Sequence, residues 1–138
     1  KSAGGDDANA YISEMIPVLM DHATMANFFS QRFETASNGP SVVSIFSQLM
    51  ASNQSLGARV VAIRGKYKGM TESAFMAAYS NRRAEMTNIE TRNEMAGMRL
   101  QVAIYSNQHR DSAEVKKLFA DLSNQAYAQM QQQPPTVQ

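Results

Sequence analysis

Apolar residues recur along much of the chain at steps of three and four, which is the spacing of one face of an α-helix. The first run spans about residues 7–36, and Pro17 lies inside it. Two alternatives follow from this proline: a helix that continues through it with one backbone bond missing, or a helix that begins near Glu14. The run contains Ile12, Met15, Ile16, Leu19, Ala23, Ala26, Phe29 and Phe33.

A second helix is predicted after Ser37-Asn38-Gly39-Pro40, because Asn and Gly end helices and Pro favours the first helical position. Its apolar positions are Val42, Ile45, Phe46, Leu49, Leu56, Val60 and Ile63. Gly57 interrupts this run, and we expect a neighbouring backbone to approach closely there. Residues 64–69 contain two glycines among basic residues and predict a turn.

Two further helical segments follow. Thr71 is a good N-cap, and the apolar run from Phe75 to Ala103 that follows it is long for one globular helix. We therefore expect a break near Thr87-Asn88. Asp111-Ser-Ala-Glu114 has the spacing of a capping box and predicts a last helix that continues to about Met130.

These helices predict one all-α domain over residues 1–138, with flexible tails at 1–6 and 131–138. No segment shows the alternation of a strand bounded by turns, and four helices with short connections favour an antiparallel four-helix bundle. The motif Val42-x-x-Ile45-Phe46-x-x-Leu49 recurs as Val115-x-x-Leu118-Phe119-x-x-Leu122. Either the chain contains a duplicated helical hairpin, or two amphipathic helices share this spacing by chance.

Composition narrows the function classes. The 138 residues are 43% hydrophobic with a net charge of +1, which argues against a disordered chain and against a dedicated nucleic-acid binder. No apolar run approaches the length of a membrane span. The absence of Cys excludes disulfides and thiolate metal sites, and the presence of only two His nearly excludes a multi-histidine site within one chain.

Several short motifs resemble a family of ferritin-like four-helix proteins of unknown function, mostly bacterial and often exported. They are Met15-Ile16-Pro17, Met25-Ala26, Pro40-x-Val42-x-x-Ile45 and Leu49. The resemblance implies a ferritin-like bundle in a periplasmic or secreted protein. In that family two adjacent histidines follow Met-Ile-Pro and look like metal ligands, whereas Val18 and Leu19 stand here. The resemblance therefore supports the fold and weakens a metal site.

Two explanations are possible for the first residue of the chain. The first residue is Lys1 rather than Met. Removal of a signal peptide and a trimmed start both account for it.

Copper is the one metal for which the residues offer candidate ligands. His22 and Met25 stand three positions apart and share a helix face, and Cu(I) accepts imidazole and thioether ligands. The alternative is structural: Met25 packs in the core and His22 lies at its edge. A ferritin-type di-iron site is disfavoured because the chain has no Glu-x-x-His motif, so Glu85, Glu90 and Glu94 predict a solvated face paired with arginines.

Partner binding has its own candidate residues. Met20, Met70 and Tyr105 fall off the core stripes and are predicted to contact a partner. Met95 and Met98 belong either to the core, which we favour, or to an adaptable groove. Arg64, Lys66 and Lys68 lie with Arg59 in a basic segment that suits an anionic partner, lipid headgroups or the acidic end of a second copy, unless it is simply a solvated bundle end.

Arg82 and Asn93 fall on the buried stripe, where a charge must be paired. Either they pair with a carboxylate across the bundle, or the register of the helix slips to expose them. No residue set resembles a catalytic site, since neither His has a motif context and the glycines are scattered. The sequence thus predicts a non-enzymatic domain that binds another protein or itself, without a cofactor. The alternative is a copper-binding bundle.

Overall fold

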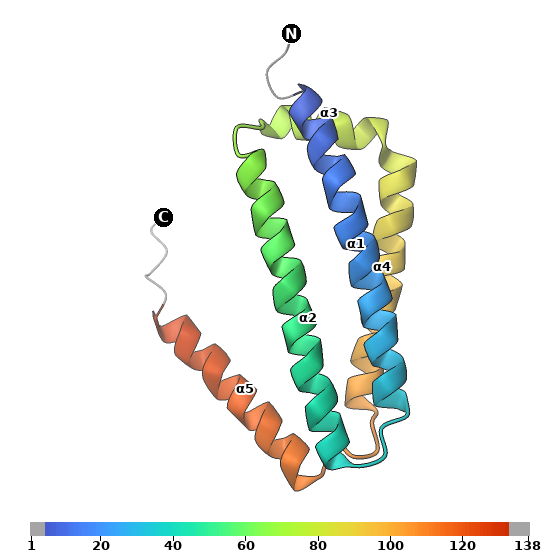
Figure 1. The fold of residues 1–138 in the computed structure, drawn as a ribbon, viewed down its shortest axis with the longest axis vertical. Helices are drawn as coiled ribbons and strands as arrows, with labels where there is room; N and C mark the ends of the chain where they lie inside the picture. The colour runs from blue at the N-terminus through green and yellow to red at the C-terminus, as the bar shows by residue number, and fades with distance from the viewer. Residues whose placement is uncertain (1–4, 133–138) are drawn as a thin grey trace.

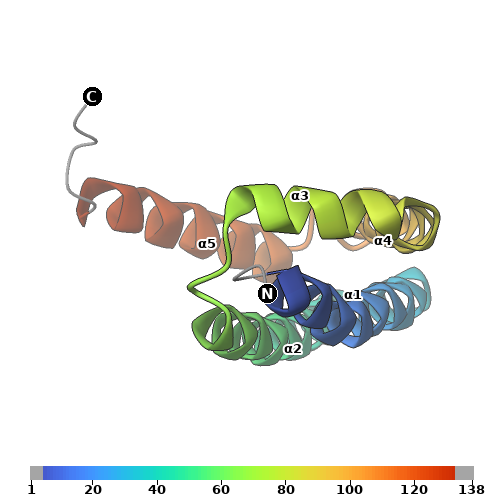
Figure 2. The ribbon, with the colours of Figure 1, turned by 90° about the horizontal axis from the view of Figure 1, so that it is seen from above.

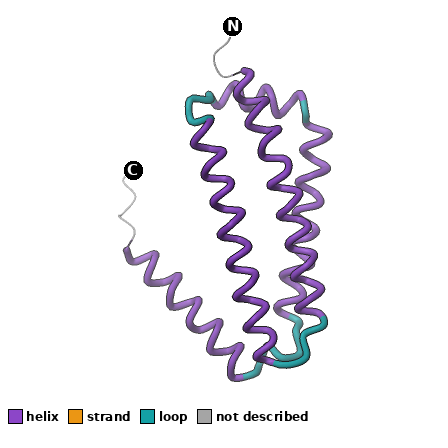
Figure 3. The backbone as a smooth tube through the Cα atoms, in the orientation of Figure 1, coloured by secondary structure: helices purple, strands orange, loops and turns teal. Residues whose placement is uncertain are grey.

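The computed structural model describes residues 5–132 as five α-helices joined by short turns. They are α1 (Gly5–Glu34), α2 (Gly39–Lys66), α3 (Glu72–Asn81), α4 (Arg83–Tyr105) and α5 (Ala113–Gln132). Loops are confined to the short connections between them (Figure 3). The described part contains helices and no strand, so the predicted all-α class is confirmed. None of its helices combines the length and apolar character needed to cross a membrane.

The helices do not form a closed four-helix bundle. α1 packs against α2, α3 and α4, whereas α5 packs against α2 alone at the level of the backbone. α1 and α4 run in one direction, α2 and α5 run in the other, and α3 crosses between them at one end (Figure 1). From its base, α5 diverges from the other helices, as the view from above shows (Figure 2). The ferritin-like arrangement is therefore not established by this fold.

Most helix boundaries follow the predicted signals. Asn38 caps α2, since its Oδ1 accepts a hydrogen bond of 2.8 Å from the Ser41 amide, and Pro40 lies in the first turn. Thr71 caps α3 by accepting from the Ala74 amide at 3.1 Å. α1 is one helix that includes Pro17, which confirms the first of the two alternatives for this proline.

Three expectations about boundaries were wrong. The break in the third helical run lies at Arg82 rather than near Thr87-Asn88, because Arg82 has non-helical angles (φ −117°, ψ 23°) and its side chain reaches α1. α5 begins after Ser112, whose Oγ accepts from the Val115 amide, so Asp111 is not the cap. The turn expected at 64–69 begins later, since α2 continues to Lys66.

The predicted tails are also shorter than expected. Gly5 and Asp6 belong to α1, and Gln131 and Gln132 belong to α5. The rest of both predicted tails lies outside the described residues.

Two apolar clusters lie at opposite ends of α1. The upper cluster, near the N-terminal end of α1, contains Ala8, Ile12, Ala78 and Met86. The lower cluster contains Phe29, Phe33, Val42, Ile45, Leu49, Ala103 and Val115. The lower cluster joins the two copies of the internal motif, because Val42 and Val115 are both buried in it and the rings of Phe46 and Phe119 lie 5.6 Å apart.

Gly57 does not mark a close approach, contrary to the expectation from sequence. A Cβ at Gly57 would meet no atom of a neighbouring element within 4 Å. The close approach occurs at Gly39 instead, where a Cβ would lie 2.5 Å from Ser112 Oγ. A glycine at the start of α2 thus allows the start of α5 to pack directly against it.

Candidate functional site

An open groove with a volume of about 510 Å³ lies between α1 and α4. Ala23 and Ala96 face each other across it, and their small side chains leave the space between the two helices open. The wall from α1 consists of Met20, Ala23, Thr24 and Asn27, and the wall from α4 consists of Ile89, Arg92, Asn93, Met95, Ala96 and Arg99. The lining is mainly apolar, with polar groups at the edges.

Methionines stand at both edges of this groove. Met20 of α1 is 47% exposed and Met95 of α4 is 66% exposed. Met98 is 60% exposed on the neighbouring surface of α4. The core position favoured for Met95 and Met98 is therefore wrong, because α4 turns Ile89, Ala96 and Ala103 toward the inside instead. Flexible thioether side chains can adapt to many apolar partners.

A network of partly buried hydrogen bonds connects the two walls of the groove. Asn93 Oδ1 lies 2.6 Å from His22 Nδ1, and Asn93 Nδ2 donates to the Leu19 carbonyl at 2.8 Å. Asn93 Nδ2 also donates to the Ile89 carbonyl of its own helix. Asn93 thus pairs across the helices, but with an imidazole and a backbone carbonyl rather than with the carboxylate that was expected. This network fixes the separation of α1 and α4 along the groove.

The cations of the groove differ in their partners. Arg99 donates to both carboxylate oxygens of Glu34, at 2.9 and 3.1 Å, and to Asn27 at 3.4 Å. The Arg99 hydrogen bond lowers the pKa of the Glu34 carboxyl. Arg92, in contrast, makes no ion pair with any residue of 5–132. The groove therefore carries one anchored guanidinium and one that a ligand can engage.

The predicted copper ligands lie on α1 beside this groove. His22 uses Nδ1 in the contact with Asn93, and Met25 packs against the lower cluster. This is the arrangement described by the structural alternative, with Met25 in the core and His22 at its edge. Within the described chain, no three side chains of the His, Cys, Asp or Glu type are grouped so that they could hold a metal ion.

The residues predicted to bind a partner are spread over the molecule. Met20 lies in the groove, and Tyr105 lies at the end of α4, where its ring stacks on Phe119 with centroids 6.4 Å apart. Met70 is half-buried against the upper cluster, whereas the ring partner of Tyr105, Phe119, packs against the lower cluster. Only Met20 is therefore part of the groove.

The basic segment at the end of α2 is partly neutralised by α1. Lys66 pairs with Glu14 and Arg59 pairs with Asp21, both at 2.7 Å. Arg64 and Lys68 are exposed and make no ion pair within residues 5–132. Glu14 and Asp21 of α1 thus pair with basic residues of the same chain.

Arg82 pairs with a carboxylate three residues later in the chain and with uncharged polar groups of α1, rather than with the carboxylate across the bundle that was expected. Its guanidinium pairs with Glu85 at 2.9 Å and donates to Ser13 Oγ at 2.6 Å and to Asn9. Of the predicted solvated acids, Glu90 accepts from the Tyr79 hydroxyl at 2.6 Å, and this bond raises the pKa of Tyr79. These contacts hold α1, α3 and α4 together at the upper end.

Sequence reasoning weighed an exposed position for Met95 and Met98 and predicted one for Tyr105, but it missed that these residues form one exposed apolar face of α4. Its signal was present as the spacing of Met95, Met98, Val102 and Tyr105, which forms a second stripe beside the buried one. One packing partner covers one apolar stripe of a helix, so the second stripe of α4 stays exposed.

The chain matches no protein-family model, and neither the curated proteins nor the solved structures contain a significant match to it, so the ferritin-like resemblance stays a prediction.

Proposed function

We propose that this protein is a non-enzymatic helical domain that works by associating with an apolar helical surface of another protein chain. The observation that carries this proposal is the apolar groove between α1 and α4 with Met20 and Met95 exposed at its edges. A groove between two helices receives a third helix through apolar anchors at helical spacing. Met and Arg, which line this groove, are also enriched in protein interfaces.

The polar edge of the groove supports the same function. Asn27, Arg92 and Arg99 line the groove together with its apolar residues, and protein interfaces likewise combine apolar and polar groups. Arg92 is available to a carboxylate of the partner, whereas Arg99 is held by Glu34. We infer that the partner is an amphipathic helix with an acidic residue beside its apolar stripe.

The ten methionines provide the test, because their methyl groups can be labelled with ¹³C and observed by NMR. The probe is a synthetic amphipathic helix with a Leu/Met face and glutamates at its border. We expect saturable shifts of the Met20 and Met95 methyl signals on titration. The signals of Met25 and Met86, which pack in the two clusters, should stay unchanged.

A pair of matched variants assigns the binding to the groove. Met20→Glu places a carboxylate in the groove, whereas Met76→Glu changes an equally exposed methionine of α3 outside it. We expect Met20→Glu to lower the affinity for the probe helix by about tenfold or more, and Met76→Glu to leave this affinity unchanged. Equal affinity in both variants, or no saturable shift at millimolar probe, contradicts the proposed function.

A further inference from the structure

The exposed stripe of α4 has the repeat of a coiled coil. Six positions, which we call the seam, follow one another at steps of three and four: Asn88, Thr91, Met95, Met98, Val102 and Tyr105. They repeat every seven residues, with Asn88, Met95 and Val102 at a positions and the others at d positions. The buried residues of α4 belong to a different face, since Ile89, Ala96 and Ala103 pack inward. The seam therefore lies on a second face of α4, separate from the face that packs inward.

Every seam position is exposed in the single chain. Met95, Met98, Val102 and Tyr105 are 59–66% exposed, and they form one contiguous row along three turns of the helix. α4 lies at the edge of the molecule opposite α2 and α5, so no other helix of residues 5–132 stands over Met95, Met98 and Val102, whereas the ring of Tyr105 stacks on Phe119 of α5 (Figure 2). A row of apolar side chains of this kind marks an interaction surface rather than ordinary scatter of surface residues.

The charges beside the seam select both the partner and its direction. Glu94 occupies a g position and Arg99 the e position five residues later. In a parallel pair of α4 helices, each Glu94 faces Arg99 of the second copy, and Thr87 faces Arg92. In an antiparallel pair, e positions face e positions, so Arg92 and Arg99 of the two copies would be brought together. A second copy in parallel orientation thus has complementary charges.

The seam residues themselves agree with a parallel dimer. Two-stranded coiled coils favour β-branched residues at a and Leu at d; Val102 provides a β-branched a residue, and Met98 stands at d where Leu is usual. A single Asn at an a position fixes register and a two-stranded state, and Asn88 provides that. The net charge of +1 opposes the approach of two copies only weakly.

We propose that two copies of this chain associate through their α4 helices as a parallel coiled coil about a two-fold axis. Met95 and Val102 meet their counterparts at a positions, and Met98 and Tyr105 meet theirs at d positions. Glu94 lies opposite Arg99 of the second copy, whose guanidinium also holds Glu34 of its own chain. Because the same face serves both copies, the assembly closes as a dimer. This proposal rests on the proposed function of protein association and names a second copy as a partner.

Sedimentation velocity over a concentration series of the full chain tests the association. We expect a reversible dimer, and a dissociation constant raised about a hundredfold by Val102→Glu, which removes two apolar contacts and places two carboxylates face to face. Met130→Glu changes an apolar residue of α5 with similar exposure and should leave the dimer intact. Circular dichroism should show the same helix content in both variants, since both positions are exposed helical sites.

Single cysteines in this cysteine-free chain test the direction. We expect Val102→Cys to form a disulfide-linked dimer on mild oxidation at micromolar concentration, because a positions of a parallel pair meet across the two-fold axis. Tyr127→Cys on α5 should not. A dimer that Val102→Cys does not cross-link, or that Met130→Glu disrupts, overturns the α4 pairing. A monomer at all concentrations that still binds the probe helix in its groove overturns the dimer and leaves the proposed function standing.

Discussion

At the scale of single residues, ion pairs from neighbouring helices hold α1 in register. Glu14 accepts hydrogen bonds from Lys66 and Tyr67, and both lower the pKa of its carboxyl. The same contacts raise the pKa of Lys66 and of Tyr67. Glu34 is held in the same way by Arg99. Each pair is exposed and therefore screened, so its contribution to stability is small and shows in the pH dependence.

These pairs predict a loss of stability toward acid. The lowered carboxyl pKa values mean that the stabilisation is present above the ordinary carboxyl pKa and is lost as pH falls through the values of the folded state. We expect the urea concentration at the unfolding midpoint to decrease as the pH is lowered from about 5 to about 2. The dependence of this midpoint on pH should be weaker in the double variant with Glu14→Gln and Glu34→Gln. Glu72→Gln, which removes an exposed carboxylate without an ion pair among the described residues, is the control. An unchanged dependence on pH in the double variant would contradict this role.

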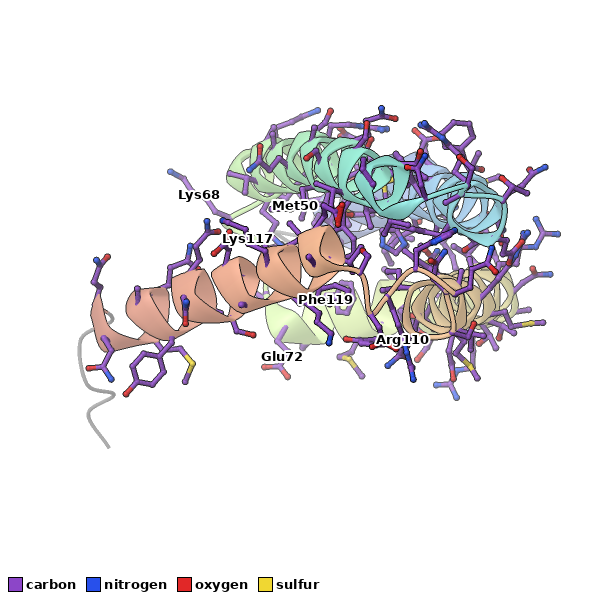
Figure 4. All side chains as sticks on the ribbon, turned by 90° about the horizontal axis from the view of Figure 1, so that it is seen from below. Met50, Lys68, Glu72, Arg110, Lys117 and Phe119 are labelled. Atoms are coloured by element: carbon purple, nitrogen blue, oxygen red, sulfur yellow. The ribbon has the colours of Figure 1, made fainter. Side chains whose placement is uncertain are left out.

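At the scale of elements, α5 is attached by its first turns. Val115 is the fully buried residue of this helix in its described length, and Phe119 contacts Phe46 of α2 and Tyr105 of α4. Beyond these turns α5 extends away from both helices (Figure 4). The attachment depends on close packing between the starts of α2 and α5, where Gly39 meets Ser112. An element held at one end is sensitive to changes at that end.

Two glycines of α2 make this dependence measurable. A methyl group at Gly39 would overlap Ser112 Oγ, so Gly39→Ala should cost about 1–3 kcal/mol and speed proteolysis within residues 113–132. Gly57→Ala has open space and removes a helix-interior glycine, so it should stabilise the chain by about 0.5–1 kcal/mol. Urea denaturation and limited trypsin digestion provide the readouts. Equal effects of the two substitutions would show that the contact at Gly39 does not hold α5.

At the scale of the whole molecule, α1 connects two separate apolar clusters. Ile12 belongs to the upper cluster and Phe33 to the lower cluster, and both are nearly inaccessible to solvent. Between them the hydrogen bonds of His22 and Asn93 tie α1 to α4. Because one continuous helix contributes to both clusters, we expect the two ends to unfold together.

Core substitutions at the two ends test this coupling. We expect Ile12→Ala to cost about 2–5 kcal/mol and Phe33→Ala about 3–5 kcal/mol, with a single transition in each case. The transitions followed by far-ultraviolet circular dichroism and by tyrosine near-ultraviolet signals should coincide. A separate early transition in one variant would mean that the clusters are independent.

The sequence by itself determined the helices and most of the inward residues, because helical spacing and caps are local properties. Asn38 and Thr71 cap the helices that they were predicted to cap, and the apolar stripes of α1 and α4 are buried along most of their length. The position of the break at Arg82 was not predictable, because it depends on contacts of this side chain with α1. The close approach at Gly39 rather than Gly57 likewise depends on which helices meet.

Only the tertiary structure decided which apolar faces are covered. Met95 and Met98 satisfy the spacing of a core helix, yet α4 has two apolar stripes and α1 covers only one of them. The groove combines residues of α1 with residues about seventy positions later, so no local pattern could identify it. Burial depends on which helix lies beside which, and that choice is made by packing between elements that are distant in the chain.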